Sequence, residues 1–344
     1  MMKLKLCFDD IIYQLQSQGG VSTYWKEITS RITVSEAFEI TRTTGNKFTK
    51  YLPVYQKSHI FHSSYYRISA NKNAINIVTI YDFIYELGYI HSFNSFLNIW
   101  QMKSAIHAAD AIVCISESTK KDLLVLYPQL KNHPHIYVVG LGATFKIDEV
   151  LNLQPPLKVL EVSRTMNKRY ILFIGKRVKY KNFKAAISGF FESSLPKLGF
   201  SMICVGSKFS EEENTLFSNL GLQDRIIAFE NLANKELNYL YQNAYALVYP
   251  SLYEGFGLPP LDAMNCGCPV IASNISSMPE VVGDAGILVD PENIGAISCA
   301  LEKLLDYEIR NNYIDKGFTR AKLFNWDEAA KKHIEIYNKL ASSL

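Results

Sequence analysis

The sequence of 344 residues contains no run of about 18 apolar residues, the length that a membrane-spanning helix needs. Its first apolar residues are interrupted by Asp9 and Asp10 before they could form the core of a signal peptide. We therefore expect a cytoplasmic protein that has no membrane span.

An excess of charge of one sign is also missing. The chain has 36 basic and 33 acidic residues, which gives a formal net charge of +3. Charges that are this evenly balanced create no global field that would attract nucleic acid. The sequence therefore predicts that nucleic acid is not a partner and that any basic binding site is local.

Ligand patterns for structural metals are absent too. The six cysteines form no C-x-x-C pair, and no histidine stands at the spacing of a zinc site. Cys266 and Cys268 are the closest pair, and two thiols without further ligands are more typical of a protein interior than of a metal site. We expect reduced cysteines, with neither a metal nor another cofactor.

Short β-branched runs alternate with stretches of helical period along the chain. This is the pattern of parallel sheets whose crossover helices cover both faces, so the sequence predicts an α/β protein. With 48% hydrophobic residues, the chain can fill two cores. The expected strands form two sets: Leu4–Phe8, Ile75–Ile80, Ala111–Ile115 and Ile136–Val139, then Tyr170–Gly175, Ser201–Val205, Arg225–Phe229, Ala246–Tyr249 and Pro269–Ala272.

The stretch between the two sets, Lys146–Arg169, is typical of a linker because it contains two prolines and no clear periodicity. We place one doubly wound domain at residues 1–160 and a second at residues 161–325. Residues 326–344 have apolar residues at helical spacing, which predicts a helix that packs back on the first domain. Two such domains face each other across a cleft, where folds of this kind bind ligands.

A basic turn follows the expected strand Tyr170–Gly175. Five cations fall within Lys176–Lys184, between the end of a strand and the start of a helix, where the helix dipole favours an anion. Arg177 could bind phosphate oxygens through two hydrogen bonds, and Lys181 could act as a point charge. A solvated basic loop is the alternative interpretation.

The segment from Tyr249 to Met264 combines glycines with carboxylates. Gly255 and Gly257 allow backbone N–H groups to approach a ligand, and Asp262 lies about one helical turn further on, facing the same side as Glu254. Amides suit phosphate and carboxylates suit diols, so this combination matches a nucleotide sugar. Alternatively, Glu254 caps the helix and Gly-Phe-Gly is only a tight turn.

The block YPSLYEGFGLPPLDAMNCGCPVIASNISSMPEVVGDAGILVDP resembles the donor-binding signature of glycosyltransferase family 4, retaining enzymes with the GT-B fold of two Rossmann-like domains. The resemblance implies that Glu254 contacts the hydroxyl groups of the donor sugar. It also implies that Asp262, where the family has a longer Glu, holds the ribose. The loop positions Phe256, Gly257 and Leu258 then reach sugar and phosphate through their amides.

The basic turn resembles the family as well, through the pattern Gly-x-Arg-x-x-Tyr-Lys-Asn-Phe that begins at Gly175. This implies that Arg177 and Lys181 hold the diphosphate. Residues 161–325 would then bind the donor, and residues 1–160 would bind the acceptor. Family landmarks occur in order along nearly the whole chain.

In the N-terminal half, Gly19 and Gly20 resemble a glycine-rich loop of the family that lines the cleft. Relatives usually have His-Asp where this sequence has Tyr81 and Asp82, and that His contacts the donor sugar. Tyr81 can donate a hydrogen bond, but with an ordinary pKa of about 10 it cannot accept a proton at neutral pH. His62 is a possible substitute or a structural histidine, and Asp82 can contact substrate or cap a helix.

The resemblance implies a metal-independent transfer with retention. Sugar transferases of the other main fold hold a metal with an Asp-x-Asp motif, which this sequence lacks, so Arg177, Lys181 and Glu254 become the candidate catalytic residues. The departing phosphate can itself take the acceptor's proton. The favoured donor is GDP-mannose or a similar sugar, and the favoured acceptor is an oligosaccharide or lipid-linked glycan of lipopolysaccharide O-antigen or capsule.

Other functions are weaker matches. A catalytically inactive partner subunit that binds sugar nucleotides is the main alternative, because positions 262 and 81 depart from the family. An epimerase or dehydrogenase would need Gly-x-Gly-x-x-Gly after the first strand, which is absent. A lipid-linked acceptor would bring the enzyme to the inner face of the cytoplasmic membrane, with the aromatic-rich stretch Tyr81–Met102 as the contact or simply as core.

Overall fold

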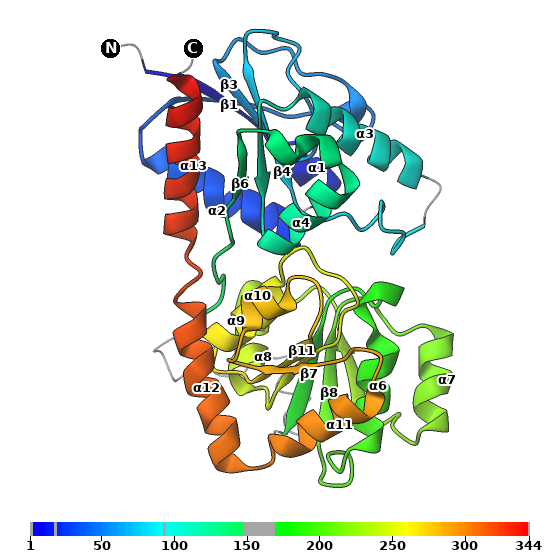
Figure 1. The fold of residues 1–344 in the computed structure, drawn as a ribbon. Helices are drawn as coiled ribbons and strands as arrows, with labels where there is room; N and C mark the ends of the chain where they lie inside the picture. Colours follow the sequence, from blue (N-terminus) through cyan, green and yellow to red (C-terminus); the bar gives the residue numbers. More distant parts are fainter. Residues whose placement is uncertain (1–2, 17–18, 92–93, 148–168, 343–344) are drawn as a thin grey trace. The chain divides into compact units, whose positions relative to one another are not determined.

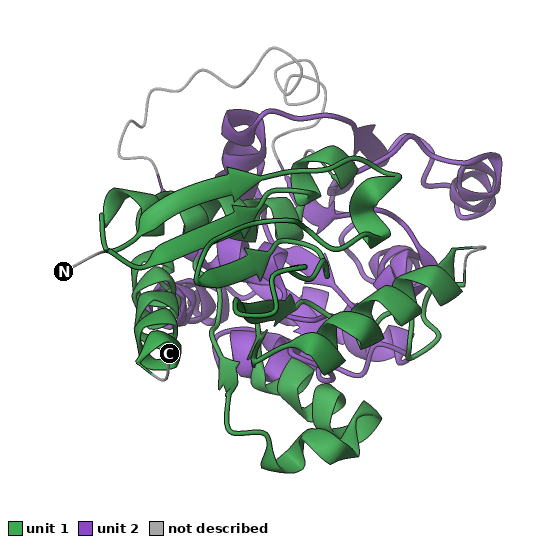
Figure 2. Ribbon diagram, turned by 90° about the horizontal axis from the view of Figure 1, so that it is seen from above, with its two compact units in different colours: residues 1–142, 324–344 green, residues 143–323 purple. Residues whose placement is uncertain are grey.

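The computed structural model describes residues 3–16, 19–91, 94–147 and 169–342. These residues form two compact units, shown in different colours in Figure 2. Unit 1 comprises residues 1–142 and 324–344, and unit 2 comprises residues 143–323. Most of the linker expected over residues 146–169 lies outside the described residues.

Unit 1 is built on a six-stranded sheet with the order β2-β1-β3-β4-β5-β6, in which every paired strand is parallel to its neighbour (Figure 1). Its strands are β1 (Lys5–Asp9), β2 (Glu39–Thr43), β3 (Ile60–Ser63), β4 (Ile75–Ile80), β5 (Ala111–Cys114) and β6 (Ile136–Val138). Its helices are α1 (Ile12–Leu15), α2 (Gly20–Val34), α3 (Ser95–Ala108), α4 (Glu117–Leu126) and α13 (Trp326–Ala341), with 3-10 turns at Thr49–Tyr51 and Pro128–Asn132.

The C-terminal helix α13 packs against α2 within unit 1 (Figure 1). Its apolar side chains recur at helical spacing and are buried, which is why the helix binds to the unit through one face. Asn325 caps its first turn by accepting a hydrogen bond from the Asp327 amide, and Arg31 of α2 forms an ion pair with the Asp327 carboxylate at 2.5 Å.

Unit 2 has a second six-stranded parallel sheet, with the order β12-β11-β10-β7-β8-β9. Its strands are β7 (Tyr170–Ile174), β8 (Ser201–Val205), β9 (Ile226–Phe229), β10 (Leu247–Tyr249), β11 (Val270–Ser273) and β12 (Ile287–Val289). Its helices are α6 (Phe183–Glu192), α7 (Glu211–Asn219), α8 (Asn234–Asn243), α9 (Leu258–Asn265), α10 (Met278–Val282), α11 (Ile294–Lys303) and α12 (Tyr307–Ala321), with a 3-10 turn at Lys179–Lys181.

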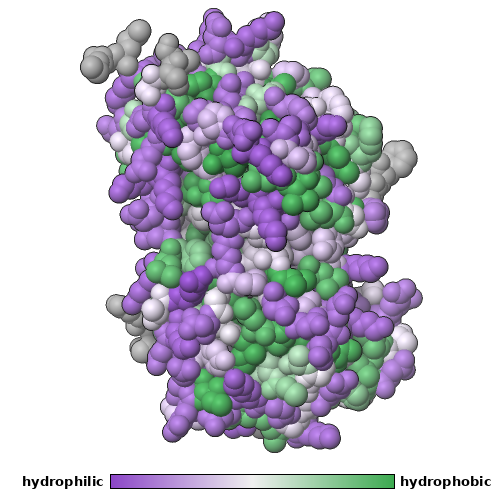
Figure 3. Space-filling model, in the orientation of Figure 1, coloured by the Kyte–Doolittle hydropathy of each residue, from purple (hydrophilic) through white to green (hydrophobic). Residues whose placement is uncertain are grey.

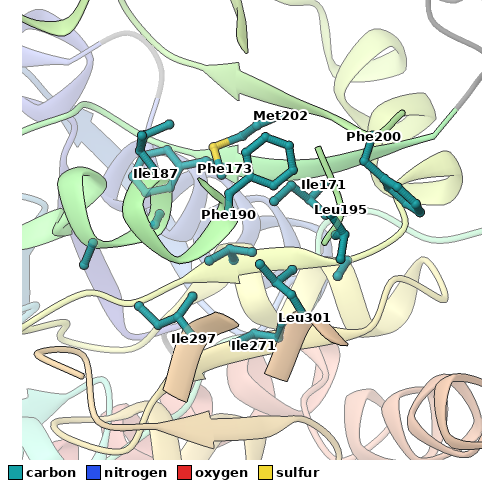
Figure 4. Close-up of a cluster of buried hydrophobic side chains, with 14 of the residues drawn as sticks. Ile171, Phe173, Ile187, Phe190, Leu195, Phe200, Met202, Ile271, Ile297 and Leu301 are labelled. Carbon is teal, nitrogen blue, oxygen red and sulfur yellow. The ribbon is translucent and has the colours of Figure 1, made fainter. Parts of the chain in front are cut away.

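The core of unit 2 lies between its sheet and the helices α6 and α11. Figure 4 shows Phe173 and Ile171 of β7 beside Phe190 of α6, while Ile297 and Leu301 come from α11. Apolar strands that are buried on both faces are typical of a parallel sheet covered by helices. This core holds the strand ends from which the functional loops leave.

The strand order of unit 2 reverses between β7 and β10. From β7 the chain first adds β8 and β9 on one side, and then returns to add β10, β11 and β12 on the other. Loops that follow two strands on either side of such a switch point diverge and leave room for a ligand at the carboxyl edge of the sheet. The turn after β7 and the loop after β10 are the two stretches that the sequence singles out.

The α/β architecture with two doubly wound parallel sheets is confirmed. Each of the nine expected strands is present to within one or two residues. Three further strands, β2, β3 and β12, were not predicted. In β2 the residues are mostly exposed and polar, because this strand lies at the edge of its sheet.

Candidate functional site

The loop after β10 carries Glu254 into the helix α9. Gly257 precedes the first residue of α9 and has φ of 112°, and a Cβ at this position would lie 2.3 Å from the Met278 Cε. The positive φ favours glycine, and any larger residue would also have to displace the end of the Met278 side chain. Pro259 and Pro260 follow in the first turn, where the missing N–H groups cost nothing.

Two serines that sequence analysis did not single out hold this loop. Ser276 Oγ donates to the Glu254 carbonyl at 2.6 Å and accepts from the Glu254 amide at 3.1 Å. Ser277 Oγ contacts the carbonyls of Glu254 at 2.9 Å and Phe256 at 2.7 Å. Ser276 and Ser277 directly precede helix α10. The position of Glu254 therefore depends on the start of α10 as well as on the start of α9.

Lys181, at the end of the turn that follows β7, extends to the Glu254 loop. Its Nζ lies 2.5 Å from Glu254 Oε1 and 2.7 Å from Tyr249 Oη. The side chains of Lys181 and Glu254 are 13% and 12% exposed, so this ion pair is mostly shielded from solvent. The Leu252 amide also donates to the Tyr180 carbonyl at 2.7 Å, which joins the two loops across the switch point.

The phenol of Tyr249 is part of this pair. Burial and the nearby Glu254 carboxylate raise the pKa of Tyr249 well above its ordinary value, so the phenol stays protonated at physiological pH. Tyr249 therefore holds the Lys181 ammonium as a neutral hydrogen-bond partner. From the sequence alone, Tyr249 is recognisable only as the end of an expected strand.

Arg177 has different partners. Its Nε and Nη2 contact the two carboxylate oxygens of Glu213 at 2.7 and 3.2 Å, and Nη2 also donates to the Lys208 carbonyl. The guanidinium lies 4.6 Å from the ring centroid of Phe209 and 5.4 Å from that of Phe183, and the side chain is 3% exposed.

Arg177 and Lys181, which are expected to hold the diphosphate, thus have different partners, and their shared role stays a prediction. Arg177 is buried among two aromatic rings and a carboxylate, whereas Lys181 extends to the glycine loop. Helix α7 presents Glu213 to the turn, and this carboxylate pairs with Nε and Nη2 of Arg177, whereas the buried Nη1 has no hydrogen-bond partner among the described residues.

Asp262 lies in α9 and is 5% exposed. Its Oδ1 accepts hydrogen bonds from the backbone amides of Thr144 at 2.6 Å and Phe145 at 3.1 Å. Burial raises the pKa of Asp262 to about 7, although these two amides, which favour the charged form, lower it. The carboxylate thus anchors the first residues of unit 2, a partner that the sequence did not predict.

In unit 1, His62 is fully buried in β3. Its Nδ1 pairs with Tyr337 Oη at 2.7 Å and its Nε2 with Thr79 Oγ1 at 2.8 Å. Both ring nitrogens are therefore used, and burial next to His333 lowers the pKa of His62 well below its ordinary value. Of the two interpretations of this residue, the geometry matches the structural histidine and not the ligand of a donor sugar.

Tyr81 is also buried, and its hydroxyl donates to the Ser64 carbonyl at 3.1 Å. The expected hydrogen bond from Tyr81 to a substrate would require this bond to break. Asp82 is half-buried, and its Oδ1 accepts from the Ile84 amide at 3.2 Å, which is a turn-capping contact. Tyr81 and Asp82 both follow β4, but the side chain of Tyr81 is buried whereas that of Asp82 is half-buried.

Gly19 and Gly20 begin α2. Gly19 has φ of 146°, and a Cβ there would lie 1.7 Å from the Gln16 Nε2, while its carbonyl accepts from the Thr23 amide. The glycine pair therefore starts a 15-residue helix in a conformation that only glycine adopts easily. Among the described residues, no group of three or more His, Cys, Asp or Glu side chains is arranged to hold a metal ion.

A family model described as "Glycosyl transferases group 1" matches residues 161–320. Over this stretch, the chain is similar to the glycosyl transferases of group 1. The matched residues span most of unit 2 and include the Lys181 turn, the Glu254 loop and Asp262. The candidate residues of unit 1 lie outside the match.

Curated relatives of this chain include the O-antigen chain mannosyltransferase B of Escherichia coli, and this chain spans somewhat less than two thirds of that relative's length. The two chains are 31% identical over 247 residues, which are 70% of this chain and 63% of the relative.

Across the described helices, none has both the length and the apolar character that a bilayer crossing requires.

Solved structures agree with the GT-B fold. Sucrose-phosphate synthase from Thermosynechococcus elongatus matches with a TM-score of 0.79 at 16% identity, over 99% of this chain and 100% of that one. HepE from Anabaena, in complex with UDP and glucose, matches with a TM-score of 0.73 at 13% identity, over 99% and 100% of the two chains. At these identities, the likeness concerns the fold alone.

Proposed function

We propose that this chain is a glycosyltransferase that moves a hexosyl group from a nucleotide-diphosphate sugar to a growing glycan. The observation that carries the proposal is the contact between Lys181 and Glu254 at the switch point of the unit 2 sheet. A cation suits the diphosphate of such a donor, and a carboxylate suits the hydroxyl groups of its sugar.

In the absence of donor, Lys181 and Glu254 satisfy each other. Donor binding would replace this single ion pair by two sets of contacts, with the ammonium on the diphosphate and the carboxylate on the sugar hydroxyls. Both side chains are about one eighth exposed, so they can reach a ligand while most of their surface stays shielded from water. Ion pairs and hydrogen bonds to charged groups are stronger at a shielded position of this kind than in bulk water.

The start of α9 would supply the remaining donor contacts. Backbone amides of Phe256, Gly257 and Leu258 lie where the helix dipole favours negative charge. Asp262 would hold the ribose diol through Oδ2, because Oδ1 is already used by two backbone amides. Arg177 would act indirectly, by supporting the turn that carries Lys181 through its ion pair with Glu213.

In the reaction, the bond between the anomeric carbon and the diphosphate oxygen breaks, and an acceptor hydroxyl forms the new bond on the same face. The hydroxyl proton passes to the departing phosphate, so the step balances without a protein base. Negative charge grows on the leaving group, where the Lys181 ammonium and the α9 amides stabilise it. We propose that this happens with retention and without a metal.

Unit 1 would bind the acceptor at the carboxyl edge of its own sheet. Gly19, Gly20 and Asp82 follow β1 and β4 at that edge. His62 and Tyr81 would support this edge from inside, because their polar atoms are bonded within unit 1. We propose this division of roles for the two units.

A mannosyl donor such as GDP-mannose is the first candidate, because the relative from Escherichia coli is described as a mannosyltransferase of O-antigen chains. The structural neighbour with UDP and glucose makes uridine donors the second candidate. The acceptor would be an oligosaccharide or a lipid-linked glycan of lipopolysaccharide or capsule.

A lipid-linked acceptor would require contact with a membrane surface on the cytoplasmic side. Helix α3 exposes Phe96, Leu97 and Trp100 on one side, at 74%, 42% and 49%, and hydrophobic side chains are visible in the region of this helix in Figure 3. Exposed Lys103 on the same helix would favour anionic lipid. If so, Trp100→Ser should reduce pelleting with anionic vesicles, and wild-type protein that stays in the supernatant would argue against membrane contact.

The test of the activity is a donor panel with a glycan acceptor, scored by product mass and by nucleotide release, with and without EDTA. Transfer from one donor that persists in EDTA is the expected result. Donor binding without any transfer would favour the alternative of an inactive partner subunit, which the substitution of Asp262 for the family's Glu motivates. Absence of both binding and transfer would refute the proposal.

A further inference from the structure

A pocket lies at the amino edge of the unit 2 sheet, opposite the Lys181 turn and the Glu254 loop. Three of its lining residues, Arg169, Phe200 and Tyr245, come just before β7, β8 and β10. Since all strands of this sheet are parallel, their amino ends lie at the edge away from the Lys181 turn and the Glu254 loop. The cavity measures about 380 Å³, within the range of small-ligand sites.

The pocket is cationic. Arg169 and Arg310 both line it, and no acidic residue does. Neither guanidinium forms an ion pair with any residue that the structure describes. Arg310 is half-buried, and a half-buried arginine normally finds a carboxylate, whereas Arg169 is exposed at the rim.

Aromatic rings hold the two arginines. The Arg310 guanidinium lies 4.8 Å from the Tyr245 ring centroid, and its Nε donates to the Tyr245 carbonyl at 3.3 Å. The Arg169 guanidinium lies 5.9 Å from the Phe200 ring centroid. Stacking of this kind orients a guanidinium while most of its N–H donors remain available to a ligand.

Apart from the polar Asn243, the remaining walls are largely apolar. Leu198 and Leu305 line the cavity, and Tyr307 stands beside it with 76% of its surface exposed. An inorganic ion alone would leave these walls uncovered. The lining therefore matches a ligand with both an oxyanion and a flat apolar part.

We propose that this pocket is a second small-molecule site of the protein, and that it binds an aromatic or other planar compound carrying a phosphate or carboxylate group. The oxyanion would lie between the Arg169 and Arg310 guanidinium groups, and the ring would lie against Phe200, Tyr245 and Tyr307. The inference concerns unit 2 alone and does not depend on the proposed transferase activity.

The test uses phenyl phosphate and benzoate as probes, with phenol and inorganic phosphate as partial probes, measured by saturation-transfer NMR and calorimetry on the full chain. We expect at least one of the two complete probes to bind more tightly than both partial ones. A preference for phenyl phosphate would identify a phosphorylated ligand, and a preference for benzoate a carboxylate.

Arg169→Gln is the decisive variant, because the Arg169 side chain makes no hydrogen bond within the described residues and its loss should leave the fold intact. We expect the probe affinity to fall about tenfold, as loss of a charge-assisted pair predicts. Lys197→Gln, which removes an exposed cation next to the pocket without lining it, should leave the affinity unchanged.

Three results would overturn the proposal. They are the failure of both complete probes to bind, an equal affinity of wild type and Arg169→Gln, and displacement of the bound probe by a nucleotide diphosphate in wild type but not in Lys181→Met. The last result would locate the probe at the Lys181 site instead. Thermal unfolding of both variants verifies that they are folded.

Discussion

Lys181 Nζ and Glu254 Oε1 lie 2.5 Å apart, although 73 residues separate them in the sequence. The strands β7 and β10 bring them together because these two strands are adjacent in the sheet and both loops leave its carboxyl edge. The proposed donor must compete with this ion pair, and several expectations follow from that competition.

Glu254→Gln should separate the two roles of the pair. Without the Glu254 carboxylate, no ion pair of Lys181 has to be broken when a nucleoside diphosphate binds. The diphosphate should therefore bind as tightly as to wild type or several-fold more tightly. Transfer of the sugar should fall strongly, since a neutral amide is a weaker acceptor for the hydroxyl groups. Calorimetry and initial rates measure the two quantities.

The matched control is Glu292→Gln, which removes an exposed carboxylate of the loop after β12. It should change neither quantity. Weaker diphosphate binding in Glu254→Gln, with transfer retained, would contradict the competition.

Arg177→Met should act on stability. The methionine can still pack between Phe183 and Phe209, but Glu213 loses the partner of a largely buried ion pair. We expect the free energy of unfolding to fall by about 2–3 kcal/mol, somewhat less than for a fully buried pair because Glu213 is 19% exposed. Denaturant unfolding measures this loss.

In the same variant, the affinity for nucleoside diphosphate should stay within a few-fold of wild type. A large loss of affinity in a stable Arg177→Met protein would restore this arginine as a direct phosphate ligand. Lys176→Met, an exposed cation one residue earlier, serves as the comparison for stability.

Asp262 should make the protein less stable as the pH rises. Its pKa is raised to about 7 in the folded state, so between pH 4 and pH 7 the unfolded chain loses this proton before the folded chain does. Asp262→Asn removes the titration and keeps an oxygen for the two amides. The difference in Tm between Asp262→Asn and wild type should therefore become larger from pH 4 to pH 7. Scanning calorimetry at several pH values measures this difference. A difference that stays constant with pH would contradict the assigned pKa.

His333 should have the opposite effect. Burial lowers its pKa to about 4, and its Nε2 pairs with the Tyr24 hydroxyl at 2.8 Å. As the pH falls from about 6.5 towards 4, His333 becomes protonated in the unfolded chain but stays neutral in the folded one. The free energy of unfolding therefore decreases. His333→Gln should lose less stability over that range, and an unchanged acid dependence of Tm would refute this origin.

The sequence allowed the architecture to be predicted in outline, because buried parallel strands read as continuous apolar runs between turn residues. Strand β2 could not be predicted in this way, because it is an edge strand with the sequence EITRT and contains no apolar run. Strand β12 was missed as well, although the predicted strands β6 and β10 are equally short.

The candidate site was predictable only in part. Glycine and carboxylate patterns revealed the Glu254 loop, and the structure brings Lys181 to it. Arg177 illustrates the limit, because its charge is visible in the sequence, whereas its partner Glu213 lies 36 residues away on α7 and is known only once the fold is formed. The same holds for His62, whose two partners come from β4 and α13.

The account depends most on Lys181 binding the diphosphate of the donor. Its most direct test is calorimetry of GDP, GMP, UDP and UMP with wild type, Lys181→Met and the exposed control Lys179→Met. We predict that Lys181→Met weakens binding of the preferred diphosphate about tenfold while the matching monophosphate changes far less, and that Lys179→Met behaves as wild type. Equal affinity of wild type and Lys181→Met for both diphosphates would contradict the account.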